Sequence, residues 1–482
     1  MALSRVTTTF RLPLREEAQR QRVELLAPAG SFEALKAAVE NGADAVYLAG
    51  QHFGARKFAK NFTDDELRRG VDFAHVRGVK VFVTVNTLVF NEEFADLVPF
   101  LALIREAGVD AVIVQDLGVM KVLRDLFPDL PLHISTQATV HNSLGVKFLE
   151  DLGAERAILA REMTLKDIVG MKQRTGAELE TFVHGALCYC YSGQCLMSSV
   201  IGERSGNRGA CAYTCRLPYD MVQGGEVMPE VREKHVLSSK DLNQIESIPK
   251  LIESGVTSFK IEGRMKRPEY VAVVTRAYRN AIDRHYAGNF HVTPEERHAI
   301  EAVFNREFTP GYLEGKEKWA FTSWDTDGNR GTPLGEVVEA GRGYVTVRLA
   351  QDLRVKDGIS VLHMPSWGHE KGGEPEEYGF TVTQIEHSGR WVTEARPGMV
   401  VTLKGHAKAS VGDKVYKTAD HDVLVAAQQT FEGPPLRRVG VAMRVEARVG
   451  KPLRVTMRDV ERGASSRRWP PPVWRRPRGA RR

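Results

Sequence analysis

The sequence lacks the features of a membrane protein, a secreted disulfide-rich protein or a disordered chain. Its longest apolar run, residues 79–90, is too short for a membrane span and contains Lys80, Thr84 and Asn86. The first twenty residues contain no apolar segment of the secretory type. We therefore expect a cytoplasmic protein with no membrane contact. The 482 residues, 42% apolar and 27% charged, are typical of a globular protein of two or three domains.

The body of the chain also lacks an excess of charge of one sign. Residues 461–482 contain eight Arg and one Glu, so they supply +7, and the rest of the chain is near −1 against a total of +6. Net charge therefore gives no support for a nucleic-acid partner, although a local basic face would suffice. We interpret residues 461–482 either as a basic tail or as a loss of reading frame near Asp459. The second interpretation is favoured, because a hairpin pattern stops in mid-course.

No GxGxxG follows the first apolar run, which argues against a dinucleotide-binding sheet. From residue 22 to about residue 286, short β-rich runs alternate with helical segments. The expected strands are residues 23–29, 43–49, 79–86, 109–116, 132–138, 155–162, 179–185, 235–239 and 258–263. Nine runs of this length exceed one eight-stranded barrel by a single strand, and 235–239 is the one we expect to be peripheral. The pattern predicts an α/β fold, a (β/α)8 TIM-like barrel over residues 22–300, with an open doubly wound sheet as the alternative.

The remaining regions differ from this barrel in composition and in the pattern of predicted elements. Residues 1–21 are an N-terminal extension, and residues 301–435 are read as a linker and a small all-β barrel, because short alternating strands are separated by Gly and Asp turns. Residues 436–460 begin a further β unit, which we expect to be truncated, and residues 461–482 are the Arg- and Pro-rich tail.

Cysteine is scarce, and all five residues lie within one segment: Cys188, Cys190, Cys195, Cys211 and Cys215. Structural disulfides are not expected in the cytoplasm, which leaves metal binding, redox chemistry or coincidence. The spacing C-x-C-x4-C-x15-C-x3-C is wide for zinc and favours an iron–sulfur cluster, while zinc and reactive thiols stay open. Four ligand places leave one thiol spare, and Cys190 is the expected spare. The intervening Gly- and Ser-rich residues can wrap a cluster and donate N–H groups to its sulfurs.

At this point the sequence resembles a known family. Residues 180–198, ETFVHGALCYCYSGQCLMS, are similar to the signature of peptidase family U32. Further resemblance lies in residues 25–50, 202–219, 260–271 and 308–315. The chain is identified as a member on these motifs. The region from about residue 325 resembles long-form members that carry an additional C-terminal domain, and this resemblance implies that most of that domain is missing here.

The family was named for collagenase-like proteolysis, whereas other members are iron–sulfur proteins that support oxygen-independent hydroxylation of RNA. The resemblance implies a [4Fe-4S] cluster on Cys188, Cys195, Cys211 and Cys215. It also implies RNA as substrate, either a 23S rRNA cytidine or a tRNA wobble uridine, with prephenate as a co-substrate. The long-form resemblance points to rRNA slightly more than to tRNA.

Two other functions stay open beside RNA hydroxylation. One is proteolysis, for which the sequence offers no HExxH and no GxSxG. Cys188 or Cys195 could act as a nucleophile with His184, but such a site would not need the other thiols. The other alternative is an inactive truncated member that keeps its cluster.

Several further residues follow predicted strands and are candidates for the site. Glu180 is either a structural partner of an arginine or an acid–base group, and His184 could transfer protons or support the cysteine loop. The expected substrate contacts are Gln137, Asn142, Arg204, Arg208, Glu262 and Arg264, of which the arginines could hold phosphates or carboxylates. Tyrosines 189, 191 and 213 could stack on bases, although packing around the cluster is the favoured interpretation.

Overall fold

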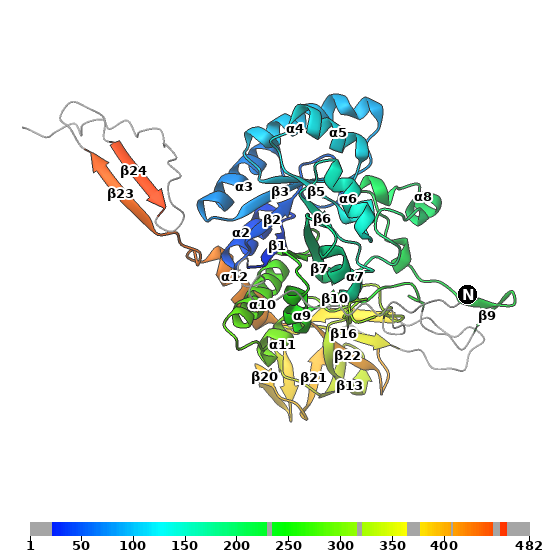
Figure 1. Ribbon diagram of the computed structural model, residues 1–482. Helices are drawn as coiled ribbons and strands as arrows, with labels where there is room; N and C mark the ends of the chain where they lie inside the picture. Colours follow the sequence, from blue (N-terminus) through cyan, green and yellow to red (C-terminus); the bar gives the residue numbers. More distant parts are fainter. Residues whose placement is uncertain are drawn as a thin grey trace, which may run out of the picture.

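The computed structural model describes residues 22–228, 234–315, 321–363, 376–405, 408–446 and 454–459. Eight parallel strands form a closed barrel, because the last strand pairs with both the first and the seventh (Figure 1). In order around the barrel they are β1 (Glu24–Pro28), β2 (Ala45–Leu48), β3 (Lys80–Val85), β4 (Ala111–Val114), β5 (Leu132–Ile134), β6 (Arg156–Ile158), β7 (Glu178–Ala186) and β11 (Ser258–Ile261). The predicted (β/α)8 fold is therefore confirmed.

Helices connect these strands and cover the outside of the barrel. They are α2 (Phe32–Glu40), α3 (Asp64–Val76), α4 (Phe94–Glu106), α5 (Leu117–Leu126), α6 (Ser143–Asp151), α7 (Leu165–Lys172), α9 (Ile248–Glu253) and α10 (Pro268–Tyr286). Local signals place their ends: the Ser31 side chain accepts the Ala34 N–H at the start of α2, and Gly42 takes a φ of +98° just beyond its end. Apolar side chains fill the space between strands and helices, and a smaller apolar group fills the barrel interior.

The segment 235–239 is not a barrel strand, as expected, and Ser239 forms only an isolated bridge with Thr322. The peripheral strand is instead β10 (Asp241–Asn243), which runs antiparallel to β7 and carries β12 (Phe308–Thr309) on its other side. Before it, β8 (Val222–Gln223) and β9 (Glu226–Val227) form a short exposed hairpin.

A second unit of antiparallel β structure follows α11 (Pro294–Val303). Its main strands are β13 (Thr332–Gly341), β14 (Tyr344–Leu349), β16 (Gly358–His363), β17 (Glu376–Thr381), β18 (Ile385–His387), β19 (Arg390–Val392), β21 (Val400–Lys404) and β22 (Lys414–Ala419). They form one sheet in the order β17-β16-β22-β13-β14-β21-β18-β19, beside a small sheet of β15 (Leu353–Arg354) and β20 (Glu394–Ala395). Among the described strands, β17 and β19 do not pair, so the sheet is open where a small barrel was expected.

The second unit ends in a helix that the β-rich interpretation of residues 301–435 overlooked. Helix α12 (His421–Glu432) begins at Asp420, whose side chain accepts the Val423 N–H. It packs against the barrel, where Asn41 donates a hydrogen bond of 2.8 Å to Thr430 Oγ1. The β unit is thus attached to the helices α2 and α10 on the outside of the barrel.

The expected partial β unit is a hairpin of β23 (Val441–Glu446) and β24 (Arg454–Asp459), drawn apart from the rest of the chain in Figure 1. Val441, Met443 and Val445 are each more than half exposed on it. The predictions for residues 1–21 and 461–482 concern parts of the chain outside the described residues. In the part of the chain that the structure describes, no helix is both long and apolar enough to cross a membrane.

Candidate functional site

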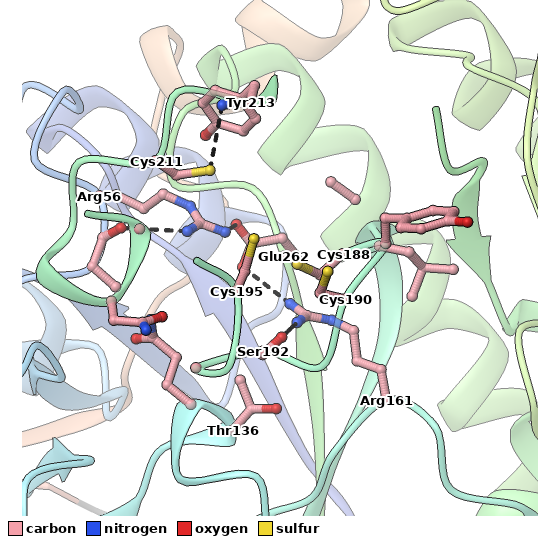
Figure 2. A pocket seen from close by; sticks show the side chains of 18 of the residues that line it. Arg56, Thr136, Arg161, Cys188, Cys190, Ser192, Cys195, Cys211, Tyr213 and Glu262 are labelled. Atoms are coloured by element: carbon pink, nitrogen blue, oxygen red, sulfur yellow. Dashed lines mark hydrogen bonds and ion pairs between the residues drawn. The ribbon is translucent and has the colours of Figure 1, made fainter. Parts of the chain in front are cut away.

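A cavity opens at the carboxyl ends of the barrel strands, where TIM-type barrels place their chemistry. Tyr47, Ile113, Phe182 and Lys260 form part of its lining on strands β2, β4, β7 and β11. A long loop after β7 completes the lining, and all five cysteines of the chain face this cavity. Figure 2 shows Cys188, Cys190, Cys195 and Cys211 together with Arg56, Arg161 and Glu262.

The first arm of this cysteine loop is attached to the β5 and β6 ends of the barrel. The Thr139 hydroxyl donates to the carbonyl of Ser192 at 2.8 Å, and Arg161 Nη1 donates to the Ser192 hydroxyl at 2.6 Å. Gly193 follows with a φ of +86°, and a Cβ there would lie 1.8 Å from the carbonyl oxygen of Gln137. Only glycine allows the loop to approach the barrel this closely.

The second arm crosses to the opposite side of the mouth. Leu88 N–H donates to the carbonyl of Asn207 at 3.2 Å, and Lys57 N–H donates to the carbonyl of Gly209 at 3.1 Å. Arg208 adds a two-pronged ion pair with Glu93, at 2.6 and 2.9 Å, after β3. The loop includes α8 (Met197–Gly202) and the short 3-10 turns at Gly206–Arg208 and Thr214–Arg216. It therefore forms a roof over the barrel mouth, fastened on both sides.

The thiols are all free and partly buried. Burial raises the pKa of Cys190 to about 11, and the neighbouring thiols of Cys195, Cys188 and Cys215 act in the same direction. Burial also raises the pKa of Cys188, and the guanidiniums of Arg161 and Arg56 oppose that rise. In the described residues no three Cys, His, Asp or Glu side chains are gathered closely enough for a single metal ion. The donor set itself, several thiols from both arms facing one cavity, suits the soft metals and iron–sulfur clusters.

Charged side chains beside the thiols make this end of the cavity cationic. Glu262 Oε1 lies 3.1 Å from Arg56 Nη2, and its Oε2 lies 3.9 Å from Arg161 Nη2. Arg264 is buried and donates to Thr84 Oγ1 at 3.0 Å. Burial alone would raise the pKa of Glu262, but the three guanidiniums lower it below its ordinary value. Arg56 and Arg161 thus share one carboxylate, and with Arg264 nearby three cations face a single anion, an arrangement able to bind a further anion.

Sequence reasoning missed two of these arginines. Arg161 is the next-to-last residue of the predicted strand 155–162, so its position at a strand end was the available signal. Arg56 follows β2 in a loop with no motif that marks it. Their ion pairs with Glu262 could not be predicted from the sequence, because Glu262 lies about one hundred or more residues further along the chain than either arginine.

Three of the predicted substrate contacts line the cavity: Gln137, Glu262 and Arg264. The side-chain oxygen of Gln137 is buried and has no hydrogen-bond partner among the described residues. A buried amide oxygen without a partner costs free energy unless a ligand or water donates to it. It is therefore placed to receive a donor from a bound molecule.

The other three predicted substrate contacts lie outside the lining of this cavity. Asn142 caps helix α6, where its side chain accepts the Gly145 N–H at 2.8 Å. Arg204 donates to the carbonyls of Ala210 and Cys211, and Arg208 is held by Glu93. The two arginines thus stabilise the cysteine loop, whereas Asn142 stabilises the start of helix α6.

The two predicted catalytic residues are also outside the cavity lining. Glu180 is fully buried inside the barrel, 3.1 Å from Arg156 Nη1 and 2.9 Å from Lys260 Nζ, which matches the structural alternative considered for it. His184 faces helix α10, where its Nδ1 lies 3.3 Å from the Tyr278 hydroxyl. Burial lowers the pKa of His184 to about 4, so its ring is neutral at pH 7.

A register shift explains the orientation of His184. Between β7 and β11 the pairing passes from Lys260 with Phe182 to Ile261 with His184, which leaves one residue of β7 unpaired. An extra residue in one strand turns the following side chain to the other face. Phe182 therefore faces the cavity, whereas His184 points outward, and the described cavity lining contains no histidine. His184 therefore points away from the cavity that Cys188 and Cys195 line, unlike the arrangement that the peptidase alternative would need.

An eight-stranded barrel covered by a fastened loop of thiols defines this chain as a TIM-barrel protein with a cysteine-lined cavity at the carboxyl ends of its strands. Residues 30–321, more than half of the chain, match the family model of peptidase family U32. The chain therefore belongs to peptidase family U32, as its motifs predicted.

Relatives in this family carry two kinds of name. A tRNA hydroxylation protein P1 of Bacillus subtilis is 41% identical over 302 residues, which are 61% of this chain and 72% of the relative. The 23S rRNA 5-hydroxycytidine C2501 synthase of Escherichia coli is 37% identical over 377 residues, 76% of this chain but only 55% of the relative. A protein named collagenase from Porphyromonas gingivalis is 31% identical over 413 residues, 82% of this chain and 97% of the relative.

Proposed function

We propose that this chain is an iron–sulfur enzyme that hydroxylates a pyrimidine of RNA without molecular oxygen. The observation that carries the proposal is the convergence of free thiols from both arms of one loop on a cavity at the catalytic end of the barrel. Relatives named for hydroxylation of tRNA and of 23S rRNA support the reaction and the RNA partner.

The residues that would hold a [4Fe-4S] cluster are Cys188, Cys195, Cys211 and Cys215, with Cys190 as the spare thiol. Such a cluster supplies one-electron redox chemistry and a Lewis-acid iron when it is bound. Four thiols that come from both arms of one loop, at sequence spacings wider than those of structural zinc sites, favour a cluster over a single zinc ion. Arg56 and Arg161 favour the thiolate form of Cys188 by their charge.

The cationic side chains next to the thiols would hold the co-substrate. Prephenate carries two carboxylates, and the three guanidiniums around Glu262 provide more positive charge than that one residue balances. Arg264 has a hydroxyl partner, Thr84, and no carboxylate within ion-pair distance in the described part of the chain. It is therefore the guanidinium most open to a carboxylate of the co-substrate, and Gln137, which lines the same cavity, can accept a hydrogen bond from a hydroxyl group.

The choice between the two RNA substrates is supported by the extent of similarity. The match to the 23S rRNA enzyme covers 377 residues, whereas the matches to relatives named for tRNA hydroxylation cover 302 to 346 residues. A 23S rRNA cytidine is therefore the favoured substrate, and a tRNA wobble uridine is the second. Proteolysis is supported by the name of the collagenase relative, but the described cavity lining offers no histidine to activate a thiol.

The test combines metal analysis with RNA analysis. The protein is expressed in an Escherichia coli strain that lacks its 23S rRNA and tRNA hydroxylation relatives, and is also purified without oxygen. We expect about four irons and four sulfides per chain, and 5-hydroxycytidine or 5-hydroxyuridine in the nucleosides of that strain by mass spectrometry. The double variant Cys211→Ala, Cys215→Ala should lose both, whereas Cys190→Ala is the matched control and should keep both. Bound zinc, or gelatin cleavage by a cluster-free protein, would overturn the proposal in favour of the peptidase.

A further inference from the structure

Two partly exposed aromatic side chains of the cysteine loop line the cavity. Tyr189 follows Cys188 on the first arm of the cysteine loop, and Tyr213 lies between Cys211 and Cys215 on the second. Both line the cavity, and they are 45% and 40% exposed. About two fifths of each residue is accessible beside the cavity, so each ring has surface available to a bound molecule.

Tyr213 is held in its position by its backbone and by its neighbours. Its φ of +53° is in the left-handed region, which is costly for a bulky residue and persists only where the surrounding structure enforces it. Its N–H donates to Cys211 Sγ at 3.4 Å, and its hydroxyl contacts Met265 Sδ at 3.0 Å. Figure 2 shows the ring above Cys211 and Arg56, at the edge of the cavity.

The cavity lies behind the roof formed by the cysteine loop, so a base that is paired and stacked in a helix could not reach it. Enzymes that modify a base inside a pocket act on unpaired nucleotides or extrude the base first. Such a base needs a new stacking partner, and exposed tyrosines are the usual ones in RNA-binding proteins.

We propose that Tyr189 and Tyr213 form a stacking clamp for one unpaired pyrimidine nucleotide, which they hold over the thiols. This inference rests on the proposed RNA function and deepens it, because it names the substrate as single-stranded or extruded RNA. Both arms of the clamp belong to the loop that carries the cysteines, so the loop that holds the cluster also positions the base.

Binding of RNA to the anaerobically purified holoenzyme tests the clamp. Fluorescence anisotropy would compare a pyrimidine-rich single strand with the same sequence in a duplex, and we expect at least tenfold tighter binding of the single strand. Loss of one stacking contact of about 1–3 kcal/mol corresponds to about 5- to 150-fold weaker binding. Tyr189→Ala and Tyr213→Ala should therefore weaken single-strand binding by a factor in this range, whereas Tyr189→Phe and Tyr213→Phe should keep it.

Tyr191 provides the matched control. It belongs to the same loop and is 46% exposed, but it does not line the cavity, so Tyr191→Ala should bind like the unchanged protein. Iron content is measured for every variant. Alanine variants that bind single strands normally, or that lose iron rather than RNA affinity, would overturn the clamp and assign the rings to shielding of the cluster. Equal binding of duplex and single strand would also overturn it.

These outcomes are distinct from a failure of the proposed function. If the chain forms no hydroxylated nucleoside but binds single strands in a tyrosine-dependent way, the reaction is wrong and the clamp stands. If nucleosides are hydroxylated with equal yield by the alanine variants, the reaction stands and the clamp is wrong.

Discussion

Replacement of Glu180 by glutamine tests whether this residue holds the barrel together or performs chemistry. The carboxylate is completely buried, with one oxygen 3.1 Å from Arg156 Nη1 and the other 2.9 Å from Lys260 Nζ. Glu180→Gln keeps the shape and removes the charge. Arg156 retains two carboxylates, Glu24 and Glu178, each at 2.6 Å. Lys260 retains no carboxylate within ion-pair distance among the described residues, so the cost falls mainly on its ammonium group.

The expected loss is about 3–5 kcal/mol in the free energy of unfolding at pH 7, the usual cost of leaving one partner of a buried ion pair alone. A double variant, Glu180→Leu with Lys260→Met, removes both charges and should recover most of this loss. Lys80→Met is the control. It breaks the contact of Lys80 with Glu24, where the lysine is 57% exposed, and should cost less than about 1 kcal/mol.

The loss should also depend on pH in a defined direction. Burial lowers the pKa of Lys260, and the charge of Glu180 opposes that effect, so the pKa falls further in Glu180→Gln. Between the folded and unfolded pKa values the unfolded chain binds more protons, and stability therefore rises with pH. The difference between Glu180→Gln and the unchanged protein should shrink as the pH is raised from 7 toward the pKa of a free lysine.

Urea unfolding of the anaerobically purified protein, followed by circular dichroism from pH 7 to 10, measures both quantities. Hydroxylation of RNA is measured on the same samples. If Glu180→Gln is as stable as the unchanged protein at every pH but hydroxylates no RNA, Glu180 acts in catalysis and the structural reasoning is refuted.

Three further predictions concern the loop and the outward-facing histidine. Gly193→Ala should lose its iron, because the added Cβ would lie 1.8 Å from the Gln137 carbonyl oxygen. Iron analysis of the purified variant checks this. Gly224→Ala is the control, since Gly224 also has a positive φ but has open space around it. Arg208→Ala should change the free energy of unfolding by no more than about 1 kcal/mol, because the ion pair with Glu93 is partly exposed. The variant should nevertheless lose iron faster in air. An unchanged rate of loss of the visible absorbance of the cluster would argue against a role of this pair in fastening the loop. His184→Gln should keep hydroxylation activity, because the ring points away from the cavity. The unchanged protein should lose stability as the pH falls from about 6.5 to about 4, because its folded state resists protonation of the buried ring. A His184→Gln variant that is stable but inactive would contradict this placement.

Local patterns determined the barrel and the location of the site. Each barrel strand is a short apolar run followed by a helix with its own start and stop residues, such as Ser31 and Gly42, and these signals act over a few positions of the chain. The five cysteines were visible because they lie within 28 residues. Their attachment to the end of β7 followed from the same pattern, since the loop begins where that strand stops.

The identity of the polar partners inside the site was decided only by the tertiary structure. Arg56 and Arg161 meet on Glu262 because strands far apart in the sequence end at the same mouth, and no local pattern encodes that meeting. A single unpaired residue in β7 turned His184 away from the cavity, and a change of one position in register is too small for periodicity to reveal. Sequence by itself determined which elements form and where the cysteines lie, because backbone conformation depends on near neighbours. Which side chains face one another was decided by the folded barrel, because those contacts join residues that only closure of the sheet brings together.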